Sequence, residues 1–234
     1  MKSTAEVLAG KSARTIAAHP DDSIWHRTKQ ALGAAWLDEA LLSRGEKGKN
    51  GTIVDRVAEE IAAANILGYC GVKFYGGSDK RLSEQTRIMA DRIKAEAVHD
   101  RIDVFIVGLF FDHPDHVATV TATLMAAEEM ATAGYAIDVL LRTDNDGGTH
   151  IAKATPESVA KTFEAMREHT QWGMSDTPHE GWILTPGDYY MDPSDWEELS
   201  LYGLTEDTAY IHITTEELAS RSFLRVMQEQ PTVA

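Results

Sequence analysis

The sequence has few of the features that mark a disulfide-bonded, secreted or membrane-bound protein. It contains one cysteine, Cys70, so no disulfide framework can form within the chain. No apolar run reaches the length of a membrane span, and the segment from Met1 to Arg14 lacks the apolar core of a secretory signal. We therefore expect a cytoplasmic protein, in which Cys70 is a buried structural thiol rather than a nucleophile.

Positive charge is also scarce in this chain. Its 22 Lys and Arg residues stand against 37 Asp and Glu residues, which gives a formal net charge of −15 at pH 7. A field of this sign repels phosphate backbones and anionic lipid surfaces, so we expect neither a nucleic-acid partner nor a membrane partner. No Gly-x-Gly-x-x-Gly pattern follows the first predicted strand, which argues against a nicotinamide dehydrogenase.

No repeat, low-complexity tract or flexible linker divides the 234 residues, so we expect one domain spanning residues 1–234. Short apolar runs alternate with longer amphipathic stretches, which is typical of βαβ units in a mostly parallel sheet. This pattern predicts the α/β class, as a Rossmann-like three-layer sandwich. The predicted strands are Thr15 to His19, Ala40 to Ser43, Val72 to Tyr75, Val104 to Phe110, Ile137 to Arg142 and Ala209 to Ile213.

Three stretches between these strands carry apolar residues at helical spacing. The first ends at Gly68 and has its apolar stripe at Val54, Val57, Ala58 and Ile61. The second ends at Gly134 and has its stripe at Val117, Val120, Thr121 and Leu124. The third contains Val159, Phe163 and Met166, with Thr155 as the expected N-cap before Pro156.

Polar clusters follow two of the predicted strands. Pro20-Asp21-Asp22 follows the first strand, and residues 111–116 follow the strand that begins at Val104. Each cluster alone is also compatible with an ordinary turn or helix start. Because ligands of open parallel sheets bind outside the carboxyl ends of the strands, we expect both clusters at the same edge. Their coincidence favours a functional site.

The first cluster has the donors of a catalytic zinc site, which typically has three protein ligands of the His and Asp type. Pro20 makes the turn after His19 stiff before any metal binds. Asp21 and Asp22 cannot easily both bind one ion from adjacent positions. One of them would bind the metal and the other would act as a general base.

The second cluster supplies His113 and His116, three residues apart at a predicted helix start, with Asp115 between them. One of the two histidines can complete the metal shell, and the other can approach an oxyanion that develops on the substrate. The residue types alone leave open which histidine takes which role.

The two clusters resemble the signatures of the LmbE-like, or PIG-L-like, N-acetylglucosaminyl deacetylases. These signatures are a strand-end Ala-His-Pro-Asp-Asp, here residues 18–22, and a later His-x-Asp-His, here residues 113–116. The resemblance spans the whole chain. Weaker supporting pieces are Gly45-Glu46-Lys47-Gly48, Arg56-Val57-Ala58-Glu59, Ala64-Asn65-Ile66-Leu67-Gly68 and His169-Thr170-Gln171.

The resemblance implies a hydrolase that uses zinc, or another divalent metal, to remove an N-acyl group. The group would be acetyl and the substrate a small-molecule amino sugar derivative. The implied metal ligands are His19, Asp22 and His116. The implied catalytic residues are Asp21 as general base and His113, oriented by Asp115, as the residue that stabilises the oxyanion.

In such a protein Glu46 and Arg56 would lie near the substrate sugar; surface charge and a helix ion pair are their simpler interpretations. Ser23 stands where the family usually has Glu, and the bulky residues 24–26 follow, which bears on the substrate more than on the chemistry. Two alternatives remain: an amidase or deacylase acting on a thiol conjugate or an antibiotic, and a non-catalytic sugar-binding protein. The sequence leaves the oligomeric state open, and a homo-oligomer is compatible with it.

Overall fold

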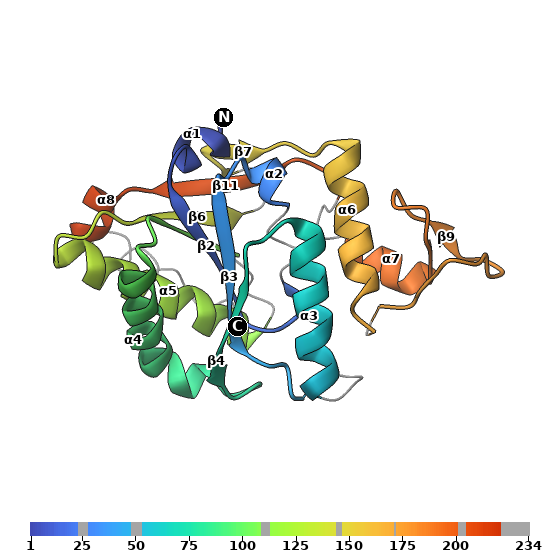
Figure 1. The fold of residues 1–234 in the computed structure, drawn as a ribbon, viewed down its shortest axis with the longest axis horizontal. Helices are drawn as coiled ribbons and strands as arrows, with labels where there is room; N and C mark the ends of the chain where they lie inside the picture. Colours follow the sequence, from blue (N-terminus) through green and yellow to red (C-terminus); the bar gives the residue numbers. More distant parts are fainter. Residues whose placement is uncertain are drawn as a thin grey trace.

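The computed structural model describes residues 1–22, 28–47, 53–108, 113–143, 147–170, 172–200 and 205–220. Its centre is an eight-stranded sheet with helices on both faces (Figure 1). The strand order is β1-β7-β11-β6-β5-β2-β3-β4. This arrangement confirms the predicted α/β class and three-layer architecture. The expectations on Ser23 to His26, Gly48, residues 109–112 and Gln171 lie outside the described residues.

Parallel pairing dominates the large sheet, as predicted. The pairs β2/β3, β2/β5, β3/β4, β5/β6 and β1/β7 are parallel, whereas β11 runs antiparallel to β6 and β7. The strands are β1 Lys2–Ser3, β2 Ser12–Ala17, β3 Trp36–Ser43, β4 Val72–Gly77, β5 Val104–Gly108, β6 Asp138–Thr143, β7 His150–Ala152 and β11 Thr208–Ile213.

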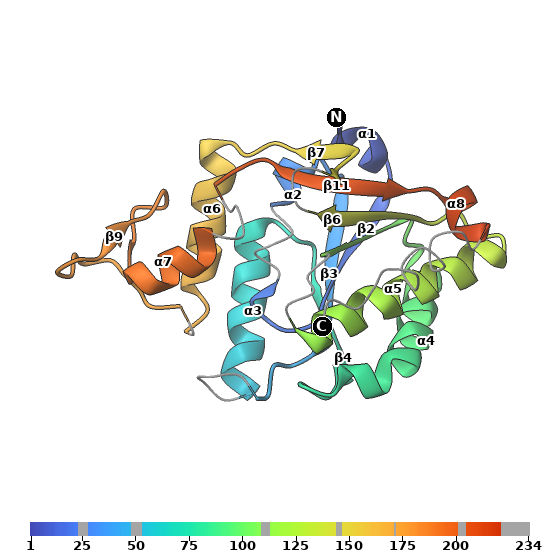
Figure 2. The same cartoon turned by 180° about the vertical axis from the view of Figure 1, so that it is seen from behind.

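The helices divide between the two faces of this sheet. One face is covered by α4 Leu82–Asp100, α5 Pro114–Thr132 and α8 Thr215–Ala219. The other is covered by α1 Thr4–Leu8, α2 Lys29–Leu32, α3 Ile53–Leu67 and α6 Pro156–Arg167. Figure 2, seen from behind, shows α5 crossing the face opposite to α3 and α6.

The buried strands supply apolar side chains to both layers. In β5, Phe105 packs in the cluster with α4 and α5, whereas its neighbour Ile106 packs in the cluster with α3 and α6. The same alternation separates Leu140 and Leu141 in β6. Because successive strand residues point to opposite faces, a strand covered on both sides must be apolar throughout. This explains the continuous apolar runs in the sequence.

Helix α3 forms where the apolar spacing predicts it, but its buried face is different. Ile61, expected in the apolar stripe, is 46% exposed, and Ala58 is exposed too. The helix instead turns two charged residues inward together with small and apolar ones. From Arg56 onward, the buried residues of this helix are Arg56, Glu60, Ala63, Ala64 and Leu67. Hydrogen-bond partners below the helix stabilise this orientation, as the site geometry shows.

The N-cap predicted for α6 is confirmed. The Thr155 side chain accepts the backbone N–H of Ser158 at 3.1 Å, and the Ser158 hydroxyl oxygen accepts the N–H of Thr155 at 2.9 Å. The prediction for Cys70 was wrong, because this thiol is exposed and lies 3.6 Å from Lys29 Nζ. It follows Gly68 in the loop after α3, where the chain is already at the surface.

A second, small sheet lies beyond α6. It contains β8 Met174–Ser175, β10 Tyr190–Met191 and β9 Ile183–Leu184 in antiparallel pairs, and it is followed by α7 Pro193–Ser200. Figures 1 and 2 show this lobe projecting sideways from the main body. Among the helices that the structure describes, none is long and apolar enough to cross a membrane.

Candidate functional site

The two His-Pro-Asp clusters meet at one edge of the sheet. Strands β2 and β5 are parallel neighbours, with Ile16 opposite Val107 near their carboxyl ends. The chain leaves β2 into His19 and Asp22, and it enters α5 at Pro114 directly after the N-cap His113. The sequence prediction that both clusters lie at the same edge is therefore confirmed.

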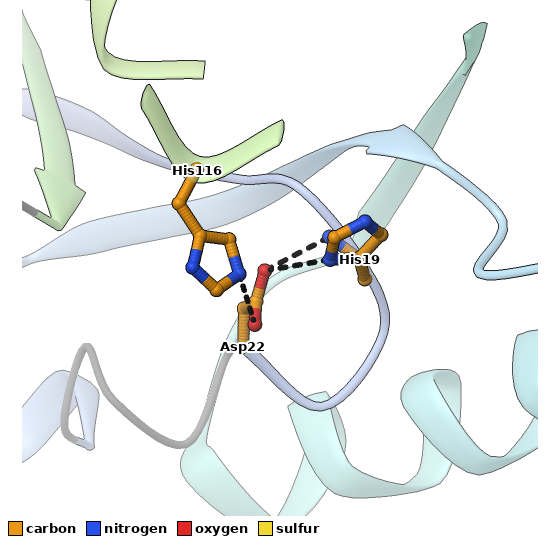
Figure 3. A group of neighbouring side chains, drawn as sticks. All are labelled: His19, Asp22 and His116. Atoms are coloured by element: carbon orange, nitrogen blue, oxygen red, sulfur yellow. Dashed lines mark hydrogen bonds and ion pairs between the residues drawn. The ribbon is translucent and has the colours of Figure 1, made fainter. Parts of the chain in front are cut away.

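His19, Asp22 and His116 form a compact group of potential metal ligands (Figure 3). One ligand atom from each lies within 4.8 Å of the others. Asp22 lies between the two imidazoles: its Oδ1 is 3.4 Å from His116 Nε2, and its Oδ2 is 3.6 Å from His19 Nδ1. Ligands at zinc distances of 2.0–2.1 Å stand about 3.3 Å apart in a tetrahedron. Each imidazole thus lies near this separation from one of the two Asp22 oxygens, and the three side chains together could hold a metal ion.

The charges around His19 also favour a cation. Its Nε2 lies 3.2 Å from both Asp79 Oδ1 and Asp115 Oδ2. Burial opposes a charged imidazole, but hydrogen bonds to Asp115, Asp22 and Asp79 outweigh it and raise the pKa of His19 to about 12. Three carboxylates converge on this ring, so the site stabilises positive charge, either as a proton on His19 or as a metal ion.

Asp22 is held as a carboxylate. Burial would raise its pKa, but His116 and His19 outweigh this and hold the pKa of Asp22 well below its usual range. Its Oδ2 also accepts the backbone N–H groups of Ala18 at 3.1 Å and His19 at 2.9 Å. The turn therefore positions this carboxylate before any ion binds.

Asp115 contacts the residues at the start of α4 in addition to the ring of His19. Its Oδ1 accepts the N–H of Leu82 at 3.0 Å, and its Oδ2 accepts the N–H of Lys80 at 2.6 Å. Burial would raise the pKa of Asp115, but His19 and these N–H groups lower it. Its backbone N–H, rather than its carboxylate, makes the contact with His113, whose Nδ1 accepts it at 3.2 Å. In the neutral imidazole this places the proton of His113 on Nε2.

Asp21 is fixed by Arg56, which α3 turns inward. Arg56 Nη2 donates to Asp21 Oδ1 at 2.6 Å, and Nη1 donates to the carbonyl of Gly45 at 3.1 Å. The pair is a charge-assisted hydrogen bond and fixes the orientation of the carboxylate. Gly45 has a positive φ of 63°, and a Cβ there would lie 2.8 Å from Arg56 Cζ. This explains why position 45, the first of the stretch Gly45-Glu46-Lys47-Gly48, is a glycine.

Asp79 is a site residue that the sequence analysis missed. It follows β4, and its Oδ2 accepts the N–H of Lys47 at 2.7 Å, while Glu46 Oε1 accepts the N–H of Asp79 at 2.9 Å. Burial would raise its pKa, but His19 and the Lys47 N–H lower the pKa of Asp79 to about 2. A signal was available, because Asp79 comes four residues after the predicted strand Val72 to Tyr75, and the segments after parallel strands lie at the same edge of the sheet.

A small cavity adjoins the site, and a larger hollow lies away from it. A cavity of about 10 Å³ lies beneath Asp22 and His116, between β2 and α5, and is about the size of one water molecule. A hollow of about 710 Å³ lies between α4 and α5, where Lys94, Glu129 and Tyr135 line it. None of the predicted site residues lines this larger hollow, so it is separate from the site at the edge of the sheet.

The fold and the site together define an α/β protein with a potential His₂Asp metal site at the carboxyl edge of its sheet. No family model matches the sequence. The curated proteins contain no match to it either.

Solved structures share the fold. N,N'-diacetylchitobiose deacetylase from Pyrococcus horikoshii superposes with a TM-score of 0.65 and 14% identity, covering 92% of this chain and 88% of that one. The deacetylase Dbv21, which acts on the A40926 pseudoaglycone, superposes with a TM-score of 0.60 and 17% identity, covering 88% and 98%. These similarities agree with the resemblance in the motifs.

The same fold also serves a different reaction. GalB from Pseudomonas putida KT2440, a 4-carboxy-2-hydroxymuconate hydratase, superposes with a TM-score of 0.55 and 16% identity, covering 86% of this chain and 95% of that one. At such identities the comparisons establish the fold alone. A function has to be argued from the residues of the site.

Proposed function

We propose that the protein is a metal-dependent hydrolase that removes an N-acyl group, acetyl in the first instance, from an amino sugar derivative. The observation that carries the proposal is the convergence of His19, Asp22 and His116 beside Asp21 at one sheet edge. Two imidazoles and one carboxylate are a common protein ligand set for catalytic zinc. The similarity in fold to deacetylases supports the same reaction class.

The side chains have separate tasks in this hydrolysis. A divalent metal held by His19, Asp22 and His116 would polarise the acyl carbonyl and the attacking water. Asp21 takes a proton from the water as its oxygen bonds to the acyl carbon. The same proton passes to the amide nitrogen as the C–N bond breaks, so that a carboxylic acid and a free amine leave. The acid keeps the second proton of the water and loses it to solvent. His113 donates its Nε2 proton in a hydrogen bond to the carbonyl oxygen as negative charge develops there.

The direct test is the release of free amine from a panel of N-acetylglucosamine derivatives. The protein is assayed as purified, after a strong chelator, and after zinc is added back. We expect release that the chelator removes and zinc restores. No release from any derivative by zinc-loaded protein would contradict the proposed substrate class.

A glycosylated antibiotic is a second candidate substrate. The observation that favours it is the similarity to the A40926 pseudoaglycone deacetylase, which covers 88% of this chain. The panel therefore includes an acylated glycopeptide and an amide of a thiol conjugate. Release from either of these alone would keep the hydrolase and change its substrate, whereas sugar binding without any release would indicate a non-catalytic protein.

A further inference from the structure

The buried face of α3 holds one peptide unit of the site from both sides. Glu60 Oε2 accepts the backbone N–H of Asp21 at 3.0 Å, and Glu60 is completely buried. One helical turn earlier, Arg56 Nη2 donates to the carbonyl oxygen of Pro20 at 3.2 Å. These two groups belong to the same peptide bond, between Pro20 and Asp21. The helix therefore fixes the plane of that peptide.

This peptide precedes a backbone conformation that side chains disfavour. Asp21 has a φ of 86°, in the left-handed region that residues other than glycine rarely adopt. Such conformations persist where the surrounding structure over-determines them, and they are concentrated at functional sites. The angle φ describes rotation about the N–Cα bond of Asp21. Glu60 holds the peptide plane before this bond and Arg56 holds the carboxylate after it, so the two contacts restrict φ together with the turn hydrogen bond from the N–H of Asp22 to the carbonyl of His19 at 3.3 Å.

A second carboxyl group supports Glu60 from the sheet. Glu39 of β3 is completely buried beside Glu60, and neither of its oxygens has a hydrogen-bond donor among the described residues. Two carboxylates cannot donate to each other, but a protonated carboxyl can donate to a carboxylate. Burial and the charge of Glu60 raise the pKa of Glu39 well above its usual range. A Glu39 that keeps its proton can donate to Glu60, and Glu60 Oε2 accepts the N–H of Asp21.

Two further polar residues, His169 and Tyr69, lie near the pair. His169 Nε2 lies 3.9 Å from Glu60 Oε2, beyond hydrogen-bond distance, and burial lowers the pKa of His169, which keeps it neutral. Tyr69 is buried, and its burial together with the charges of Glu39 and Glu60 raises its pKa well above the usual range.

Burying two carboxyl groups between a helix and a sheet is energetically unfavourable, because both lose their contact with water. Apolar side chains of similar size at such positions are often neutral for stability or improve it. A buried acidic pair that contacts a strained turn beside the proposed general base has the character of a functional feature. We propose that Glu60, supported by Glu39, is a positioning residue that fixes the left-handed backbone of Asp21. This inference rests on the proposed function, in which Asp21 is the general base.

The test compares two ways of changing the pair. In the double variant Glu39→Leu/Glu60→Leu the acceptor is lost and the space stays filled. In Glu60→Gln the side-chain carbonyl still accepts the N–H of Asp21, and the amide donates to Glu39. For the double variant we expect an unchanged or higher Tm, unchanged bound zinc and KM, and a kcat lowered by about 10²-fold, as expected for a misplaced catalytic group. Glu60→Gln should recover most of that loss.

Glu84→Leu is the matched control, because it removes an exposed carboxylate from α4. It should leave kcat unchanged. A double variant with wild-type kcat would overturn the proposal, and so would a Glu60→Gln variant that loses as much kcat as the double variant. If the double variant does not fold, Glu60→Met takes its place and the same outcomes apply.

A crystal structure of Glu60→Leu separates this inference from the proposed function. The φ of Asp21 should leave the left-handed region when the acceptor is removed, whatever the protein hydrolyses. Retention of a positive φ would overturn the positioning role. Failure of the wild-type protein on every amide of the panel would instead contradict the proposed function and leave the structural comparison valid.

Discussion

At the scale of single residues, the site concentrates carboxylates around one imidazole. Asp22, Asp79 and Asp115 all approach His19, and only Asp115 and Asp22 come from the clusters that the sequence analysis singled out. Such a group is electrostatically unfavourable unless it holds a positive charge. A metal ion in this position would therefore compete with the proton of His19, and its affinity should increase with pH.

The role of Asp21 gives the sharpest prediction for a single residue. Asp21→Asn keeps the size of the side chain and an oxygen that can accept from Arg56, but it cannot take up a proton. We expect bound zinc to be unchanged and amine release to fall by about 10²–10⁴-fold, the range for general acid–base catalysis. Metal content and turnover are measured on the same preparation. Full activity in zinc-loaded Asp21→Asn would exclude Asp21 as the base.

The motifs predicted the grouping of His19, Asp22 and His116, because parallel strands bring their carboxyl ends to one edge. They could not show that Glu60 lies under Asp21. A glutamate in an amphipathic helix is normally solvated, and its burial depends on a partner distant in sequence. The contact between Glu60 and Asp21 is therefore visible only in three dimensions.

At the scale of elements, α3 shows how polar contacts can override an apolar pattern. The spacing of Val57 and Ile61 predicted the helix correctly, but its rotation follows Arg56 and Glu60. Those residues form hydrogen bonds with the turn after β2, and Ile61 remains largely exposed in consequence. The helix α4 was not predicted, since its mean hydropathy is low and its exposed face is rich in charge.

Asp138 at the start of β6 links three elements away from the site. Its Oδ2 accepts Lys11 Nζ at 2.7 Å, and its Oδ1 accepts the N–H of Thr215, the first residue of α8, at 2.9 Å. Burial would raise its pKa, but His212 and Lys11 outweigh this and hold the pKa of Asp138 well below its usual range. The folded-state pKa is thus below the unfolded value of about 3.9.

A group with a depressed pKa stabilises the fold above its unfolded pKa and loses this effect as pH falls. Asp138→Asn should therefore lower the free energy of unfolding at pH 7 by about 1–2 kcal/mol, since partly exposed charged partners are screened. The difference from wild type should shrink below about pH 4. Urea unfolding at pH 7, 4 and 3 measures it. A difference that stays constant over this range would contradict the assignment.

At the scale of the whole molecule, the pattern of apolar residues predicted the layered architecture better than the direction and extent of individual strands. Alternating apolar runs and amphipathic stretches predicted a mostly parallel sheet between helices, and the structure has this architecture. The antiparallel direction of β11 and the small sheet of residues 172–200 were not predicted. Strand direction depends on long-range pairing, and strands of two residues are too short to produce a periodic pattern.

The fold itself is shared by deacetylases and by a hydratase, so the molecule's overall shape does not determine its reaction. The proposed hydrolysis depends instead on a metal ion at His19, Asp22 and His116. The most direct test is amine release measured against bound zinc while chelated protein is reloaded stepwise. We expect activity to rise in proportion to zinc and to level off near one ion per chain. Undiminished amine release by the metal-free protein would contradict the account.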